Sequence, residues 1–98
     1  MQQDYQIENN ETQSMWEAKL SADNTTVGYL TYEFHDDDIY FTHTVVKQEY
    51  QGNGIAAKLV RTALEHERNL GENKVVPVCS YVQGYIQKHP EYESILAD

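Results

Sequence analysis

Hydrophobic and polar residues alternate along much of the first half of the chain, a pattern that predicts antiparallel strands joined by tight turns. Residues 26–35 are rich in Thr, Val, Tyr and Phe, and shorter alternating runs cover residues 5–9 and 15–21. Asp23 and Asn24 are typical turn residues and separate two of these runs. We therefore expect an antiparallel meander at the start of the fold.

A fourth alternating segment, residues 39–46, follows the acidic triplet at residues 36–38, which is expected to form a solvated hairpin tip. Strict alternation places two sets of side chains on opposite faces: Ile39, Phe41, His43 and Val45 on one, and Tyr40, Thr42, Thr44 and Val46 on the other. His43 is therefore expected to share a face with the apolar residues of this strand.

The second half of the chain changes to a helical period. Apolar residues recur at helical spacing from Ala56 to Leu70, which predicts a helix over residues 53–70 that Gly71 closes in a left-handed conformation. Residues 74–78 predict a short apolar strand. A second helix is expected to start with Ser80 as its cap and to run to Lys88 before Pro90.

This order of elements predicts one domain over residues 1–98 of α/β (α+β) class, in which antiparallel strands precede a βαβα unit. Pro77 needs an explanation, because a proline inside a strand removes a donor from the hydrogen-bond ladder. Either residues 74–78 form an edge strand, or this strand and residues 39–46 splay apart at Pro77. The sequence leaves both open.

Composition limits the function. With 40% hydrophobic residues and eight tyrosines the chain is expected to fold, and no apolar run approaches the roughly 20 residues that span a bilayer. A net charge of −9 argues against nonspecific nucleic-acid binding and fits a cationic or amine partner.

With no signal-like N-terminus and one cysteine, a cytoplasmic location is expected. His35, His66 and His89 lack metal-ligand spacing, so no metal is expected.

The segment Gln51-Gly52-Asn53-Gly54-Ile55-Ala56 stands between a strand and a helix, where free amides and the helix dipole favour a phosphate. The nucleoside triphosphate loop is excluded, because neither lysine nor Ser/Thr follows Gly54. The dinucleotide motif matches formally through Gly52, Gly54 and Ala57. However, Cys79 occupies the place of its ribose-binding acid.

A third pattern, Gln/Arg-x-x-Gly-x-Gly/Ala, is met by Gln51, Gly54 and Ala56 and resembles the acetyl-CoA loop of the GNAT acetyltransferase superfamily. The segments His43-Thr44-x-Val46, Pro77-x-Cys79-Ser80-Tyr81-Val82 and Tyr85-Ile86-x-Lys88-His89-Pro90 extend the resemblance. Over residues 27–96 the chain is similar to short, single-domain GNAT-like proteins. The resemblance implies two splayed central parallel strands, with the pantetheine arm of CoA between them.

The resemblance also implies roles for individual residues. Backbone amides would hold the pyrophosphate at Gln51, Gly52, Asn53, Gly54, Ile55, Ala56 and Ala57. Val45 and Val46 would offer strand groups to the pantetheine, and Lys58 would add a charge near the phosphates. The chain lacks the helices that form the acceptor site in larger relatives. A small-molecule or protein amine would then bind in an open pocket of a protein expected to be a monomer.

Three side chains are candidates for acetyl transfer. Cys79 directly precedes a predicted helix, whose N-terminus lowers a thiol pKa, and the resemblance matches it to a possible acyl-accepting cysteine. His43 is a candidate base, and Tyr85 a candidate acid for the leaving thiolate. Buried structural roles remain open for all three. We expect an acetyl-CoA-binding N-acetyltransferase; the alternatives are a noncatalytic module that binds or senses acyl-CoA and a dinucleotide-binding fragment.

Overall fold

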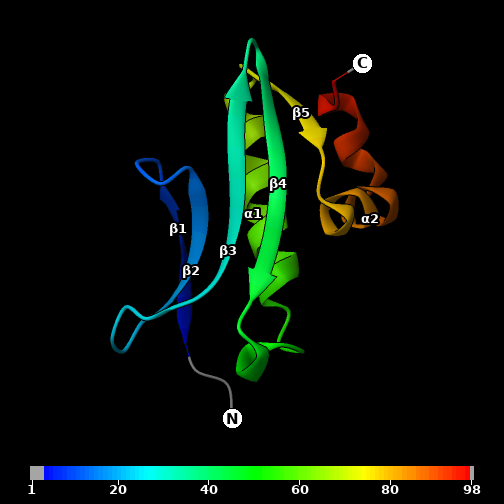
Figure 1. Ribbon diagram of the computed structural model, residues 1–98. Coiled ribbons are helices and arrows are strands. Elements are labelled where there is room, and N and C mark those ends of the chain that lie inside the picture. Colours follow the sequence, from blue (N-terminus) through cyan, green and yellow to red (C-terminus); the bar gives the residue numbers. More distant parts are fainter. Residues whose placement is uncertain (1–3, 98) are drawn as a thin grey trace.

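The fold is a five-stranded sheet with one long helix across one face (Figure 1). The computed structural model describes residues 4–97. The chain forms β1 (Tyr5–Asn10), β2 (Met15–Leu20), β3 (Thr26–His35), β4 (Asp38–Val46), a 3-10 turn η1 (Gln48–Tyr50), α1 (Ile55–Leu70), β5 (Lys74–Pro77), α2 (Ser80–Lys88) and the 3-10 segment η2 (Pro90–Ile95).

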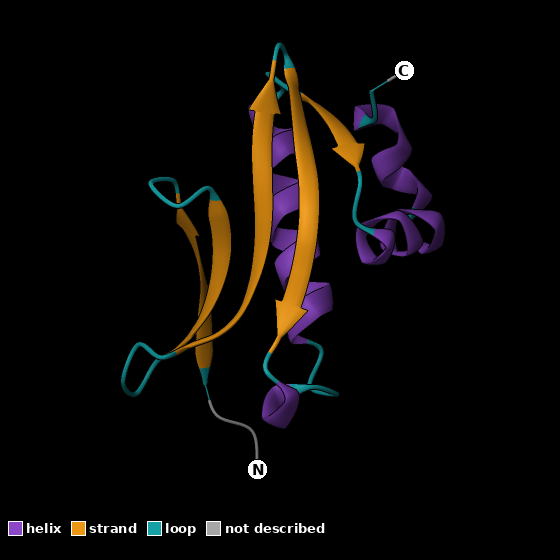
Figure 2. Cartoon of the chain, viewed as in Figure 1, coloured by secondary structure: helices purple, strands orange, loops and turns teal. Residues whose placement is uncertain are grey.

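The sheet has the order β1-β2-β3-β4-β5, with antiparallel neighbours except for the parallel pair β4 and β5. The predicted meander followed by a βαβα unit is therefore confirmed. Tight turns make the meander possible, and Ser14, Asn24 and Asp36 adopt positive φ there. In Figure 2, α1 crosses behind β3 and β4, and no helix lies in front of them.

The core lies between α1 and the sheet. The buried residues of α1 are Ile55, Leu59, Val60, Ala63, Leu64 and Glu67. Across from them, Leu30 of β3 and Phe41 of β4 are fully buried. The predicted apolar stripe is shifted at its two ends, because Leu70 is 45% exposed and Ile55, not Ala56, enters the core. Helical spacing gives the face of a helix but not where the sheet beneath it ends.

Helix boundaries follow local backbone chemistry. α1 begins at Ile55, two residues later than expected, because Gly54 adopts a left-handed φ of 76° as its N-cap. Gly71, with φ 68°, closes the helix as expected. Cys79, not Ser80, is the N-cap residue of α2, and its side chain makes no capping hydrogen bond.

Glu67 is a carboxyl group in the core. The residue is only 3% exposed, and its Oε1 has no hydrogen-bond partner among the described residues. Burial raises the pKa of Glu67, and the charge of Glu72 acts in the same direction, while the Asn73 side chain and His66 lower it. A raised pKa means that the fold favours the neutral acid.

Glu67→Gln is expected to stabilise the protein at alkaline pH. Because folding raises this carboxyl pKa above its ordinary value of 4.5, the stability that Glu67 contributes is full below that value and is lost as the pH rises through the folded pKa. The variant should be more stable than the parent near pH 8 and about equally stable near pH 4, measured by urea denaturation. Glu49→Gln, at an exposed position whose charge does not act on Glu67, is the control. A parent that is the more stable protein near pH 8 would contradict this prediction.

Candidate functional site

The pairing of β4 with β5 ends abruptly at Phe41 and Pro77. The carbonyl oxygen of Phe41 accepts hydrogen bonds from the amides of both Val78 (3.1 Å) and Cys79 (3.0 Å), so it closes the ladder. Beyond this point no residue of β5 pairs with β4, and Figure 1 shows β5 running away from it. Both explanations of Pro77 hold, since β5 is an edge strand and Pro77 stands where the two strands part.

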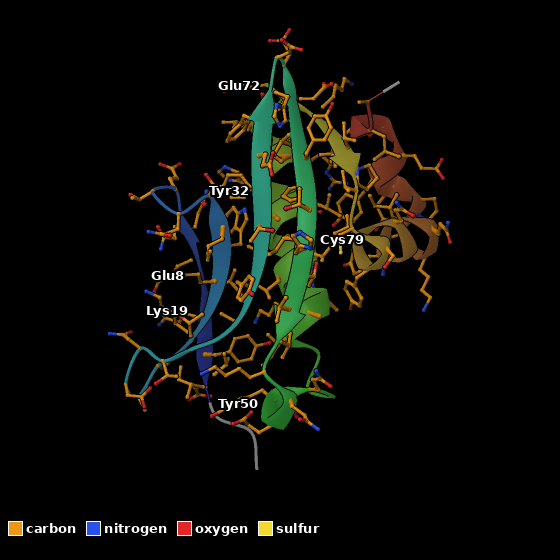
Figure 3. The ribbon with its side chains drawn as sticks, viewed as in Figure 1. Glu8, Lys19, Tyr32, Tyr50, Glu72 and Cys79 are labelled. Atoms are coloured by element: carbon orange, nitrogen blue, oxygen red, sulfur yellow. The ribbon has the colours of Figure 1, made fainter. Side chains whose placement is uncertain are left out.

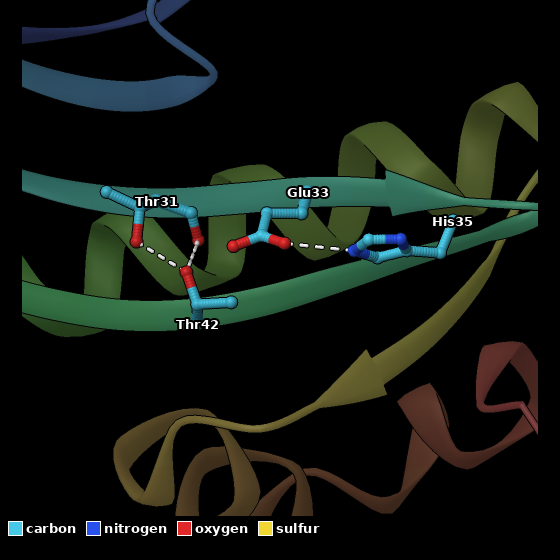
Figure 4. A network of polar contacts seen from close by, with 4 residues as sticks. All are labelled: Thr31, Glu33, His35 and Thr42. Atoms are coloured by element: carbon cyan, nitrogen blue, oxygen red, sulfur yellow. Dashed lines mark hydrogen bonds and ion pairs between the residues drawn. The ribbon is translucent and has the colours of Figure 1, made fainter.

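One extra residue in β4 lies just beyond the end of this ladder. Tyr32 pairs with Phe41 and Thr31 pairs with His43, so Thr42 has no partner of its own and forms a β-bulge. The hydroxyls of Thr42 and Thr31 are 2.6 Å apart, and Thr42 Oγ1 also donates to the Thr31 carbonyl oxygen at 3.3 Å (Figure 4). These contacts fix the bulge between two neighbouring strands.

The bulge reverses the alternation of side chains along the rest of β4. Ile39 and Phe41 are buried beneath α1, but His43 and Val45 beyond the bulge are exposed. The expectation that His43 and Val45 share a face with Phe41 is therefore wrong. An inserted residue changes the face of every later residue, and apolar alternation alone cannot show it.

A cleft of about 390 Å³ opens between the end of β4, the loop before α1 and the start of α2. Its lining residues are Thr44, Val46, Tyr50, Gln51, Gly52, Gly54, Ile55, Ala56, Ala57 and Tyr81. Seven of the ten residues expected at the cofactor are among them. Val45, Asn53 and Lys58 are not, although the role expected of Val45 involves its backbone.

The loop before α1 is held open by its backbone and by two amide side chains. Gly52 and Gly54 have φ of 85° and 76°, conformations that other residues adopt at a cost. Gln51 Nε2 donates to the Val46 carbonyl oxygen at 3.1 Å, and Asn53 Nδ2 to that of Tyr50 at 3.0 Å. Asn53 thus supports the loop from outside the cleft.

The first residues of α1, whose amides have no partner within the helix, line this cleft. The first helical hydrogen bond here runs from the Lys58 amide to the Gly54 carbonyl oxygen at 3.0 Å, so the amides of residues 55–57 precede the bonded part of the helix. Together with the helix dipole they suit an anionic group. Lys58 is not among the lining residues, and its Nζ lies 5.4 Å from the centre of the Tyr5 ring.

Cys79 lies beside β4 at the start of α2 (Figure 3). Its Sγ is 3.4 Å from Thr44 Oγ1, so the bulge that turns His43 outward also brings Thr44 to the thiol. Burial acts to raise the pKa of Cys79, but the Thr44 hydroxyl and the amides of Val82 and Tyr81 outweigh it, and the pKa is lowered overall. The Cys79 thiol therefore loses its proton more readily than that of an ordinary cysteine.

Tyr81, rather than Tyr85, lines the cleft. The Tyr85 ring stacks on His89 with 4.1 Å between ring centres, and burial raises its phenol pKa, so Tyr85 keeps its proton at neutral pH. Sequence reasoning missed Tyr50 and Thr44 as lining residues. Tyr50 could have been found from its position next to the glycine loop, whereas Thr44 required knowledge of the bulge.

Among the described residues, no helix covers the face of the sheet opposite α1 (Figure 2). On it, Glu33 Oε1 contacts His35 Nε2 at 2.9 Å, close to the Thr31–Thr42 pair (Figure 4). Within residues 4–97 no three His, Cys, Asp or Glu residues gather as potential metal ligands. No described helix is long and apolar enough to cross a membrane.

Comparisons with known proteins agree with this geometry. A sequence model of the GCN5-related N-acetyl-transferase family matches residues 15–95. The structure is similar to that of a GCN5-like protein from Staphylococcus aureus, with a TM-score of 0.70, 26% identity and coverage of 94% of this chain and 87% of that one. A search of curated protein sequences finds no match.

Two other solved structures share the fold. One is a GCN5-related glucosamine N-acetyltransferase region in a fungal multi-domain β-N-acetylglucosaminidase, with TM-score 0.51 and 25% identity, covering 68% of this chain and 8% of that protein. The other is a ribosomal-protein-alanine N-acetyltransferase from Brucella melitensis biovar Abortus, with TM-score 0.53 and 19% identity, covering 87% of this chain and 64% of that one. The match to the Brucella protein supports the fold alone.

Thr44→Val is expected to make Cys79 less reactive at neutral pH. The substitution keeps the side-chain shape but removes the hydroxyl that helps to lower the thiol pKa, so the midpoint of the pH–rate curve for alkylation by iodoacetamide should move upward. Thr26→Val, which removes a hydroxyl from β3 that does not act on the thiol, is the control and should leave the midpoint unchanged. Equal shifts in both variants would show that Thr44 has no specific effect on the thiol.

Proposed function

The chain belongs to the GCN5-related N-acetyltransferase family, and we propose that it binds acetyl-CoA in the cleft at the start of α1 and transfers the acetyl group to an amine. The observation that carries this proposal is that the glycine loop and residues 55–57, whose amides are not bonded within the helix, together line the cleft. An anion bound by these amides would lie at one end of the cleft, and Cys79 lies near the other.

The parting of β4 and β5 supports the position of the pantetheine arm. Beyond Phe41 no described strand pairs with β4 on the β5 side, so backbone groups there can pair with the two amides of pantetheine, apart from the Val46 carbonyl oxygen, which accepts from Gln51 Nε2. Val46 borders the cleft on this side. The thioester would then reach the neighbourhood of Thr44 and Cys79.

Two chemical routes fit this arrangement. In direct transfer the amine nitrogen attacks the thioester carbonyl carbon, the carbon–sulfur bond breaks, and the CoA thiolate leaves. In the covalent route the Cys79 thiolate attacks first and displaces CoA, and the amine then attacks the acetyl-cysteine. The lowered thiol pKa of Cys79 favours the covalent route, because the thiolate is the nucleophilic form.

The acceptor would approach from the uncovered face of the sheet. His43 is exposed on this face, beside the residue at which β4 loses its strand partner, and we assign to it the removal of a proton from the incoming amine. No helix covers this face within the described residues, so the acceptor site is open. The acidic chain favours a positively charged amine over an anion.

Gly54→Ala is expected to weaken acetyl-CoA binding by at least about tenfold, or about 1.4 kcal/mol. Its left-handed φ of 76° is strained for alanine, and the loop must shift or the new methyl group must enter the cleft. Gly71→Ala is the matched control, because Gly71 has a similar φ of 68° and equal free space at the other end of α1.

Calorimetric titration of both variants with acetyl-CoA tests this prediction. Gly71→Ala should lose a similar amount of stability, measured by urea denaturation, and keep the affinity of the parent. If the parent protein does not bind acetyl-CoA at millimolar concentration, the proposed donor is wrong. Equal losses of affinity in the two variants would place the donor away from Gly54.

Cys79→Ala is expected to abolish transfer while leaving acetyl-CoA binding within about twofold, since the removed sulfur is a small part of the cleft. Release of free CoA in the presence of primary amines measures transfer, and intact mass of the parent with acetyl-CoA alone reports an acetyl group on Cys79. Transfer that persists in the variant would exclude the covalent route. Binding without any transfer by the parent would instead indicate a noncatalytic acyl-CoA module.

A further inference from the structure

The link between β5 and α2 carries the Cys79 thiol, and its backbone is bonded on two sides. On one side, the Phe41 carbonyl oxygen of β4 accepts from the amides of Val78 and Cys79. On the other side, Nε2 of Gln83 in α2 donates to the carbonyl oxygen of Pro77 at 2.8 Å and to that of Val78 at 3.4 Å. The link is therefore attached to β4 and to α2 at once.

These contacts hold two successive peptide units at both ends. In the unit between Pro77 and Val78, the N–H donates to Phe41 and the carbonyl oxygen accepts from Gln83. The next unit, between Val78 and Cys79, is bonded to the same two partners. A peptide unit is planar and rigid, so contacts at both of its ends set its orientation. Both units lead directly to the Cα of Cys79 and thus set the direction in which its side chain leaves the backbone.

Gln83 reaches this link because it lies one helical turn after Cys79, on the same stripe of α2. Its backbone amide donates to the Cys79 carbonyl oxygen at 3.1 Å, so Gln83 contacts the chain on both sides of the thiol. A glutamine amide has two N–H donors and no charge, and it can serve two carbonyl oxygens at once. Val82 and Ile86 of α2 are buried in the core, so Gln83 transmits the position of a fixed helix to the link.

The thiol depends on this placement because its polar contacts come from two different elements. Cys79 Sγ lies 3.4 Å from Thr44 Oγ1 on β4, while α2 starts at the next residue. Burial raises the pKa of the Cys79 thiol, and the Thr44 hydroxyl and the amides of Val82 and Tyr81 lower it by more. A small shift of the link would lengthen these contacts, and hydrogen bonds weaken with distance.

We propose that Gln83 is a positioning residue for Cys79, whose side-chain amide keeps the link between β4 and α2 in the orientation that places Sγ beside Thr44. Gln83 is not among the residues that line the cleft, so it acts through the link and not on the donor. Its effect on the thiol is independent of the acyl donor. Its effect on acetyl transfer rests on the proposed covalent route through Cys79.

Gln83→Met tests the proposal, because methionine keeps the length and helix propensity of glutamine but has no N–H donor. The residue is exposed, so the change leaves the core intact. The midpoint of the pH–rate curve for alkylation of Cys79 by iodoacetamide should rise by at least about 0.3 pH units, a twofold change in the thiolate fraction below the midpoint. A midpoint equal to that of the parent would overturn the proposal.

Gln87→Met is the matched control. Gln87 lies one turn further along α2, is exposed, and lines with Gln83 the same hollow of about 420 Å³ between β5, α2 and η2. It donates to neither carbonyl group of the link, so its replacement should leave the midpoint unchanged. Equal shifts in the two variants would show a general effect of losing an amide from α2 and would overturn the role of Gln83.

Combining Gln83→Met with Thr44→Val tests how Gln83 acts. Because Gln83 is proposed to keep Sγ beside Thr44, the two residues should be coupled. The double variant should therefore shift the midpoint by less than the sum of the two single shifts. Shifts that add would overturn the assignment of Gln83 to this contact.

Acetyl transfer separates this proposal from the proposed function. Gln83→Met should lower kcat for CoA release in the presence of primary amines and keep acetyl-CoA affinity within about twofold of the parent. A loss of affinity that Gln87→Met does not share would place Gln83 at the donor and overturn its positioning role. If the parent neither binds acetyl-CoA nor transfers acetyl, the proposed function fails, while the alkylation midpoints still decide the role of Gln83.

Discussion

The arrangement of the cleft depends on one residue inserted in β4. Because Thr42 bulges, the side chains beyond it reverse their faces, so that Thr44 and Val46 turn to the cleft and His43 and Val45 to the open face. Without the insertion Thr44 would not meet the Cys79 thiol. The bulge lies next to Phe41, whose carbonyl oxygen makes the last bonds to the β5 side. One irregular residue beside the point where β4 and β5 part thus selects the side chains that face the opening.

The sequence predicted most of the elements because their signals are local. Gly71 closes α1 as its position indicated, and the strand predicted over residues 26–35 from its Thr, Val, Tyr and Phe content has the same bounds as β3. The loop before α1 could be predicted because positions with positive φ favour glycine, as at Gly52 and Gly54, and because the helical pattern follows directly. The element order was enough to predict the mixed sheet with one parallel pair. These features each depend on residues within a few positions of one another.

The errors arise where a residue's environment is set by a distant partner. Thr42 has the composition of an ordinary strand residue, and only the register against Thr31 and Tyr32 shows that it is unpaired. Leu70 continues the helical stripe but extends past the sheet that would bury it. The thiol pKa of Cys79 reflects contact with Thr44, 35 positions away, more than its place before a helix suggested. Candidate residues could be named from the sequence, but their relative orientation required the fold.

The negative charge of an acidic protein repels a phosphorylated ligand, and binding has to overcome this repulsion. With a net charge of −9, long-range electrostatics oppose a polyanion such as CoA, so the attraction has to be short-range. Backbone amides can supply this short-range attraction without any charged side chain. Three amides stand at the N-terminus of α1 beside the cleft, and amides at the start of α2 lower the pKa of the Cys79 thiol. The same field favours a protonated amine at the open face. Under the proposed function, a chain of this charge would attract its acceptor from a distance and hold its donor by local dipoles, so the two substrates would use opposite sides of one sheet without competing for the same charged groups.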